Sequence, residues 1–222
     1  CFQDSEYIYQ FKFEKPVDDR QLLINPGIFT LTNSPTGVIF KNIEFKKRSL
    51  LDSVSNTSKI ISDAHTFFNK LHIYDKLNRP KKRGVLLYSS PGLGKTSAIE
   101  KVCLDLIAED PGTVVIVWPT SQIEADDVVK LLTLNSRYAD QCSRMVLIIE
   151  DIGGGEQERH RSMNGVTSGL LNLLDGVGIV FRLPTFIIAT TNYPENLLSS
   201  LADRPGRFDL MLKLQPPSPQ ER

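Results

Sequence analysis

The sequence predicts an α/β fold in which a mostly parallel sheet is flanked by helices and preceded by a small β-rich element. Apolar runs of strand length recur at 85–88, 113–118, 145–149 and 185–190, and the intervals between them are long enough for helices. These runs are apolar without alternation, which is typical of parallel strands buried on both faces.

The N-terminal part is expected to be β-rich. Residues 7–13 alternate aromatic or aliphatic with polar side chains, and 27–45 contains two further β-rich runs broken by the turn residues 33–37. We therefore expect a small β element over 1–48.

A helix is expected to lead from this element into the main domain. From Ser49 onward, apolar side chains recur at helical spacings as far as Leu71. The main α/β domain is expected over 49–222.

Composition excludes several classes of protein. With 222 residues and 41% hydrophobic content, the chain has enough apolar material for a sizeable core, which argues against disorder. Lys+Arg and Asp+Glu balance at 26 each, so net charge gives no sign of a nucleic-acid partner. No apolar run reaches the roughly 18 to 20 residues that span a bilayer. The three cysteines lack metal-ligand spacing. We expect a soluble chain without a membrane segment, in the reducing cytoplasm.

A glycine-rich turn follows the first apolar run. Residues 84–100 read GVLLYSSPGLGKTSAIE, a strand, a tight turn and then Lys95-Thr96 opening a helix, which is the context that a phosphate-binding P-loop requires. In such a loop Lys95 reaches the terminal phosphates and the Thr96 hydroxyl ligates magnesium. The expected ligands are therefore ATP and Mg2+. The expected binding residues are Ser89, Ser90, Pro91, Gly92, Leu93, Gly94, Lys95, Thr96 and Ser97.

One position of this loop departs from the usual pattern, because Ser89 stands where glycine is usual. A Cβ there is expected to shift the backbone slightly. The alternative interpretation, an ordinary turn with a chance Gly-Lys-Thr, has to be judged against the downstream motifs.

Two carboxylates follow the third apolar run, where Glu150 and Asp151 end the expected strand. In a P-loop ATPase the first acid at this position holds magnesium and the second orients the attacking water. By position we assign Glu150, with Thr96, to the metal and Asp151 to the water. Because the usual order is Asp then Glu, the two roles could be exchanged.

Polar residues also follow the fourth apolar run. Asn192 ends that strand, where an amide would reach the γ-phosphate or the attacking water. Arg204 and Arg207 flank a Pro-Gly turn, which suits guanidinium groups that act on a phosphate of a neighbouring subunit. Each feature alone is more often a turn or a solvated surface. Their order behind the P-loop favours a catalytic set of Lys95, Glu150, Asp151, Asn192, Arg204 and Arg207.

Taken together, these motifs resemble those of AAA+ ATPases of the AAA branch. The P-loop, the acidic pair, IIATTN at 187–192 and RPGRFD at 204–209 fall in family order. The closer resemblance is to AAA ATPases similar to the mitochondrial translocase of the Rieske protein, and to their bacterial and viral relatives. The shared features are KKRGVLLY at 81–88, the Glu-Asp order at 150–151 and SGLLNLLDG at 168–176.

The resemblance implies the large α/β subdomain of a P-loop AAA+ ATPase, working as a homo-oligomeric ring of six or seven subunits on a protein substrate. It implies Asn192 as the first sensor, and Arg204 and Arg207 as arginine fingers that act in trans. It also implies a helical lid, and 214–222 resembles only the entry to that lid. We therefore expect the lid to be absent or truncated in this chain.

Two other functions stay open. A module that binds ATP to assemble but hydrolyses little is suggested by Ser89 and the reversed acids. A clamp-loader-like or helicase-like DNA motor is suggested by the basic runs 46–48 and 81–83, although these lack interleaved stacking aromatics. Nucleic acid is therefore not the expected partner. Trp118, at a strand end, is expected in the core.

Overall fold

A computed structural model describes residues 8–10, 24–35, 37–45, 55–120, 138–152, 181–194 and 207–214, together with Ile123, Val128, Leu170, Leu173 and Leu174. Its strands are β1 (Ile8–Gln10), β2 (Gly27–Ser34), β3 (Gly37–Asn42), β4 (Lys82–Tyr88), β5 (Thr113–Pro119), β6 (Arg144–Glu150), β7 (Thr185–Thr191) and β8 (Leu210–Lys213). Its helices are α1 (Ser55–Asn69), α2 (Leu71–Lys76) and α3 (Lys95–Glu109).

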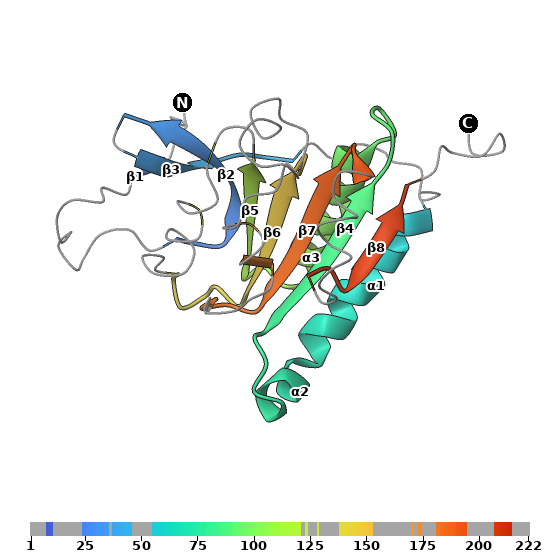
Figure 1. Cartoon of the computed structure of the whole chain (residues 1–222). Coiled ribbons are helices and arrows are strands. Elements are labelled where there is room, and N and C mark those ends of the chain that lie inside the picture. The colour runs from blue at the N-terminus through green and yellow to red at the C-terminus, as the bar shows by residue number, and fades with distance from the viewer. Residues whose placement is uncertain are drawn as a thin grey trace.

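The strands form one sheet in the order β1-β3-β2-β5-β6-β7-β4-β8 (Figure 1). Every pairing from β2 through β5, β6, β7 and β4 to β8 is parallel, whereas β3 runs antiparallel to β1 and β2. Consequently the carboxyl ends of the parallel strands share one edge of the sheet, which we call the carboxyl edge. Their amino ends share the opposite edge, the amino edge.

The two faces of the sheet are buried in two separate clusters. Helices α1 and α3 cover one face, with Phe67 of α1 and Leu106 of α3 packed over Val146 and Ile188. The other face packs Trp118 and Leu147 against apolar residues that include Leu173. Burial on both faces explains the unbroken apolar runs, and the α/β fold class predicted from them is confirmed.

The first strands continue the same sheet. Strand β2 pairs with β5, for example Phe29 with Ile116, and Phe29 and Phe40 lie in the cluster that contains Trp118. The β-rich segment is therefore present as expected, while a domain boundary after residue 48 stays a prediction.

Two further expectations have outcomes in the described part. Trp118 is confirmed as a core residue, being 1% exposed, and its indole N–H donates to the Ile123 carbonyl at 3.0 Å. None of the described helices has the length and apolar character needed to cross a membrane.

Candidate nucleotide site

The candidate residues that the structure describes meet at the carboxyl edge, except Arg207. The loop from Ser89 to Gly94 follows β4, and Lys95 begins α3. Glu150 is the last residue of β6, and Asn192 directly follows β7. Because β6 and β7 are adjacent and β7 pairs with β4, residues far apart in the sequence come together here.

The loop conformation depends on two glycines. Gly92 and Gly94 have φ values of 80° and 79°, in the left-handed region that favours glycine. Ser89 is not among the described residues with positive φ, so the serine that replaces the usual glycine requires no strained backbone. The backbone shift expected from its Cβ is therefore not needed to explain the loop.

Lys95 is held by the loop that precedes it. Its ammonium group donates to the Ser89 carbonyl at 3.0 Å, the Ser89 hydroxyl at 2.9 Å and the Ser90 carbonyl at 3.3 Å. It also donates to the Asn192 side-chain carbonyl at 2.6 Å. The lysine is thus folded over the loop, bound to neutral oxygen atoms.

Asn192 connects this lysine to the acidic pair. Its amide group donates to the Asp151 carboxylate at 3.0 Å, so that Lys95, Asn192 and Asp151 form one chain of hydrogen bonds. Asp151 has a φ of 53°, which is uncommon for a residue with a side chain. Its N–H donates to the Thr190 hydroxyl at 3.0 Å, and the Thr120 hydroxyl donates to the Glu150 carbonyl at 2.8 Å. Hydroxyl groups from both neighbouring strand ends therefore support the turn.

The two acids are directed to different surroundings. Glu150, Glu100 and Thr96 line one cavity of about 290 Å³, whereas Asp151 contacts Asn192. Burial raises the pKa of the Glu150 carboxyl, and the charges of Asp151 and Glu100 add to that increase. One Glu100 carboxylate oxygen is buried without a hydrogen-bond partner. The negative charges are crowded, which is typical of sites that receive a cation.

Partial burial lowers the pKa of the Lys95 ammonium, while the nearby Asp151 carboxylate acts in the opposite direction. A lysine whose pKa is lowered by burial is typical of functional sites.

The residues present fit the phosphates of a nucleotide and its magnesium. A Cβ added to Gly92 or Gly94 would meet nothing within 4 Å, so space is open over the loop. Gly94 caps α3 without a side-chain hydrogen bond, which leaves the first N–H groups of a 15-residue helix directed at this space. Thr96 is exposed in the first turn of α3. Among the described residues, no group of three or more His, Cys, Asp and Glu could hold a metal.

Comparison with known proteins identifies the family. The model of the ATPase family associated with various cellular activities (AAA) matches residues 85–216, more than half of the chain. The chain belongs to the AAA ATPase family. The family predicted from the motifs is confirmed.

Individual AAA relatives are similar over most of this chain. The "Probable mitochondrial chaperone bcs1" of Schizosaccharomyces pombe is 33% identical over 186 residues, which cover 79% of this chain and 39% of that protein. An "AAA-ATPase" of Arabidopsis thaliana is 30% identical over 169 residues, which cover 70% of this chain and 32% of that protein. A "Putative cell division cycle ATPase" of Plasmodium falciparum is 30% identical over 159 residues, which cover 68% of this chain and 12% of that protein. The chain thus spans well under half the length of these relatives.

The predicted arginine fingers lie apart from this cluster or outside the described residues. Arg207 stands just before β8, at the amino edge, and is 6% exposed. A Cβ on Gly84 would lie 2.9 Å from the Arg207 carbonyl oxygen, so only glycine fits at this approach. Arg204 lies outside the described residues. The expected roles of both arginines stay predictions.

Sequence reasoning missed three groups that support this site. The hydroxyl groups of Thr120 and Thr190 hold the acidic turn, and Glu100 lies beside Glu150. Threonine is common at strand ends, so its presence there gives no sequence signal for a role in the site. Glu100 could have been found, because a glutamate one helical turn after Thr96 lies on the same face of α3.

Proposed function

We propose that this chain binds ATP with magnesium and hydrolyses it to ADP and phosphate. The observation that supports this most directly is the chain of hydrogen bonds from Lys95 through Asn192 to Asp151. It connects a phosphate-binding cation to a carboxylate that could orient water, through an amide that could sense the terminal phosphate.

Each residue has a proposed role. Lys95 and the N–H groups at the start of α3 bind the phosphates. Thr96 and Glu150, which share one cavity, hold magnesium, and Asp151 orients the attacking water. Bound magnesium would neutralise phosphate charge. The common cavity of Thr96 and Glu150 supports assigning Glu150 rather than Asp151 to the metal.

We further propose that the chain acts in a ring and remodels or translocates a protein partner. Arg207 lies at the amino edge, away from Lys95 of its own chain, which supports action on a neighbouring subunit. A protein substrate is suggested by the word "chaperone" in the name of the S. pombe relative. That name also contains "mitochondrial", so the cytoplasmic location expected from the cysteines stays a prediction.

A second candidate is a module that binds ATP to assemble but hydrolyses little. The reversed order of the acids favours it, because the shorter Asp151 stands where a glutamate usually orients the attacking water. The DNA motor is less favoured. Within the basic run 81–83, Lys81 pairs with Asp75 at 2.8 Å and Arg83 with Asp63 at 2.6 Å, so the cations at both ends of the run already contact carboxylates.

Turnover measured against protein concentration tests the proposal. If a finger comes from a neighbour, turnover per subunit rises as rings form, and Arg207→Ala subunits bind ATP but do not hydrolyse it. Mixing them with Lys95→Ala subunits should restore partial activity, because some interfaces then join an intact P-loop to an intact finger.

Two outcomes would contradict this function. Assembled rings without turnover would favour the assembly module, and mixed rings that stay inactive would argue against action in trans. Because Arg207 is buried, circular dichroism must first show that Arg207→Ala is folded, and Arg204→Ala provides a second finger variant.

A further inference from the structure

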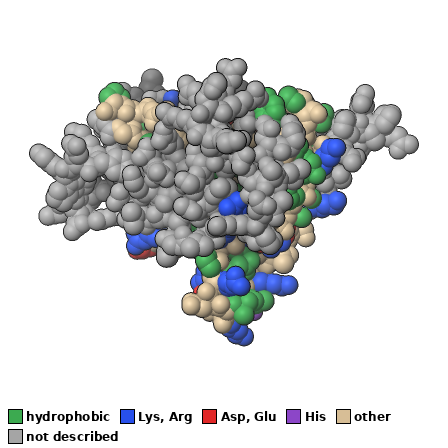
Figure 2. Space-filling model, in the orientation of Figure 1, with side chains coloured by type: hydrophobic (Ala, Val, Ile, Leu, Met, Phe, Trp, Pro, Cys, Tyr) green, Lys and Arg blue, Asp and Glu red, His purple; other side chains and the backbone are tan. Residues whose placement is uncertain are grey.

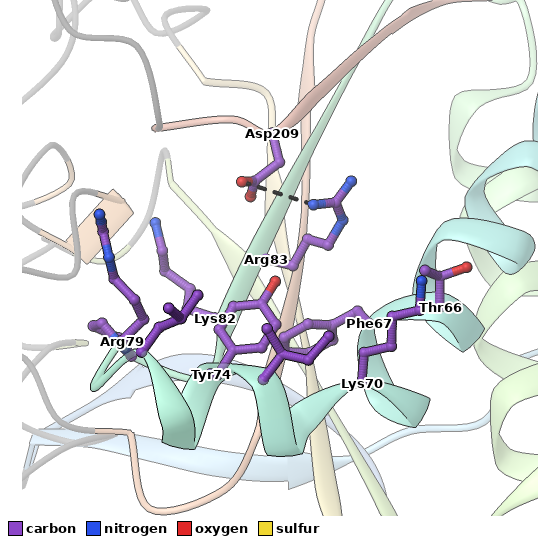
Figure 3. A pocket seen from close by; sticks show the side chains of 11 residues that line it. Thr66, Phe67, Lys70, Tyr74, Arg79, Lys82, Arg83 and Asp209 are labelled. Atoms are coloured by element: carbon purple, nitrogen blue, oxygen red, sulfur yellow. Dashed lines mark ion pairs between the residues drawn. The ribbon is translucent and has the colours of Figure 1, made fainter.

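A second pocket lies at the amino edge of the sheet, away from the nucleotide site. It has a volume of about 560 Å³ and is formed by the end of α1, by α2, by the turn into β4 and by Asp209 before β8 (Figure 3). This volume is within the range of ligand sites in proteins, about 300–1,000 Å³. We call it the amino-edge pocket.

The pocket is basic. Its lining contains four cationic side chains, Lys70, Arg79, Lys82 and Arg83, against one acid, Asp209. Figure 3 shows these side chains around a floor formed by Phe67 and Tyr74.

These cations differ in whether they already contact a carboxylate of the chain. Arg83 donates two hydrogen bonds to Asp63, at 2.7 and 2.6 Å, and lies 3.9 Å from Asp209. Lys70 and Arg79 are exposed, and neither forms an ion pair within the described part of the chain. Arg83 thus belongs to the structure of the pocket wall, while Lys70 and Arg79 are available to an anionic partner.

Apolar side chains extend from the pocket to the surface. Phe67 and Tyr74 pack edge to face, with ring centroids 5.3 Å apart. At the rim, Ile73 is 40% exposed and Leu77 is 65% exposed. These are two of the three large hydrophobic side chains that are exposed among the described residues. In Figure 2, Lys, Arg and hydrophobic side chains gather around α2 at the lower end of the molecule.

This combination indicates what could bind. A surface with aliphatic side chains beside available cations complements a segment with carboxylates next to apolar residues. Single-stranded nucleic acid fits less well, because bases stack on exposed aromatic faces. Here the exposed apolar side chains Ile73 and Leu77 are aliphatic, Phe67 is 2% exposed, and Tyr74 is half-buried and packed against Phe67. An acidic, apolar peptide segment is therefore the better match.

The pocket also touches the segment that carries a predicted finger. The N–H of Gly84 donates to the Asp209 carboxylate at 2.8 Å, and the N–H of Asp209 donates to the Gly84 carbonyl at 2.8 Å. Asp209 is thus both a wall of the pocket and a near neighbour of Arg207. An occupant would contact the same short segment.

We propose that the amino-edge pocket is a docking site for an acidic, apolar peptide segment of a partner protein. Lys70 and Arg79 attract its carboxylates, and Ile73, Tyr74 and Leu77 receive its apolar side chain. This binding does not require nucleotide, so it can be tested independently of the proposed ATPase activity.

Fluorescence anisotropy of the full chain without ATP tests this proposal. The probe is a short fluorescein-labelled peptide with Leu and Phe between Asp and Glu residues. One comparison peptide has Ser in place of Leu and Phe, and another has Asn and Gln in place of the acids. We expect the first peptide to bind most tightly, with affinity that falls at high ionic strength.

Matched charge reversals identify the site. The double variant Lys70→Glu, Arg79→Glu should weaken binding about tenfold or more, whereas Lys41→Glu, Lys59→Glu, also at exposed positions, should leave it unchanged. Leu77→Ser should weaken binding a few-fold through the apolar contact. Circular dichroism and ATP affinity check that each variant is folded.

Three results would overturn the proposal. The first is binding that does not distinguish the peptides, or no binding. The second is unchanged affinity in the Lys70, Arg79 variant. The third is preferential binding of a single-stranded oligonucleotide at these residues. If the variant instead changes the oligomeric state in sedimentation while no peptide binds, the pocket receives a second copy of this chain and not a partner protein.

Discussion

The two edges of the parallel sheet differ in how their charges are paired. At the amino edge, Arg83 donates two hydrogen bonds to Asp63, and Arg144 contacts Glu109 at 2.9 Å. At the carboxyl edge, neither Glu150 nor Asp151 forms an ion pair within the described part of the chain.

This difference separates structural charges from charges kept for a ligand. A guanidinium paired with a carboxylate is satisfied within the folded chain, and removing one partner destabilises the fold. Crowded carboxylates beside a lysine bound only to neutral oxygens are unfavourable in the isolated chain, and such arrangements occur where a ligand brings the missing charges. Variants at the two edges should therefore affect different properties.

The largest effect is expected at Lys95. Lys95→Ala should weaken ATP binding by roughly 100-fold or more, because it removes the cation of the phosphate loop. Titration with a fluorescent ATP analogue measures the loss. Lys101→Ala, a partly exposed lysine on the same helix, is the control and should bind normally. Unchanged ATP affinity in Lys95→Ala would show that the loop is an ordinary turn and not a phosphate-binding loop.

The acids should affect turnover more than binding. Asp151→Asn is expected to retain ATP affinity but to lower turnover by roughly two orders of magnitude, the effect of losing a group that orients water. Glu150→Gln should instead raise the magnesium concentration needed for activity. Steady-state turnover against magnesium concentration distinguishes them. If Glu150→Gln traps bound ATP while Asp151→Asn hydrolyses normally, the roles assigned by position are exchanged.

Stability should respond in opposite directions at the two edges. Asp63→Asn should lower the free energy of unfolding by about 1–3 kcal/mol, because Arg83 loses a partly buried partner. Asp75→Asn, at an exposed pair with Lys81, should change it by about 0.5 kcal/mol or less. Glu150→Gln should raise the Tm of the nucleotide-free chain, because it removes a carboxylate whose charged form is disfavoured by burial and by the charges of Asp151 and Glu100.

The gain in Glu150→Gln should depend on pH. The pKa of Glu150 is raised by burial, so the folded state holds the proton more tightly than the unfolded state does. The penalty for ionising the wild-type residue therefore begins as pH rises above the ordinary glutamate pKa of the unfolded chain, and it is complete once pH has passed the raised pKa of the folded chain. The gain in Tm should be absent in acid, grow through this pH window and be largest above it. If Glu150→Gln still raises the Tm at acidic pH, the gain does not come from removing the charge of Glu150.

The sequence predicts the strands well and the side-chain partners poorly, for a physical reason. Runs such as 145–149 are apolar because both faces are buried, and this pattern is visible locally. The left-handed turn at Asp151 depends on Thr120 and Thr190, which come from neighbouring strands. Their contribution is tertiary and leaves no local signal.

The same reason applies to the basic run at 81–83. As a linear sequence it suggests a surface for nucleic acid. In the fold, Lys81 meets Asp75 of α2 and Arg83 meets Asp63 of α1. A charge count along the chain cannot separate paired cations from available ones such as Arg79, because the pairing is set by which helix packs beside β4.

The smallest effect is expected at Ser89, where the sequence departs from the usual P-loop. Its hydroxyl accepts a hydrogen bond from Lys95 at 2.9 Å and donates one to the Ser90 carbonyl at 3.0 Å. Phosphate must displace the first of these contacts. A hydrogen bond of this kind contributes about 0.5–1.5 kcal/mol, so Ser89→Ala should tighten ATP binding by about 2- to 10-fold.

Alanine is the informative replacement because it removes the hydroxyl without the added backbone freedom of glycine. Ser90→Ala is the matched control, since Ser90 contributes only its backbone carbonyl to Lys95. Competition titrations with the fluorescent analogue measure all three proteins. If Ser89→Ala binds ATP more weakly, the hydroxyl contacts the nucleotide directly. In the nucleotide-free chain, the Ser89 hydroxyl would then occupy the position that a phosphate oxygen takes beside Lys95 when ATP binds. The charges at the carboxyl edge would therefore already have the arrangement of the ATP-bound state.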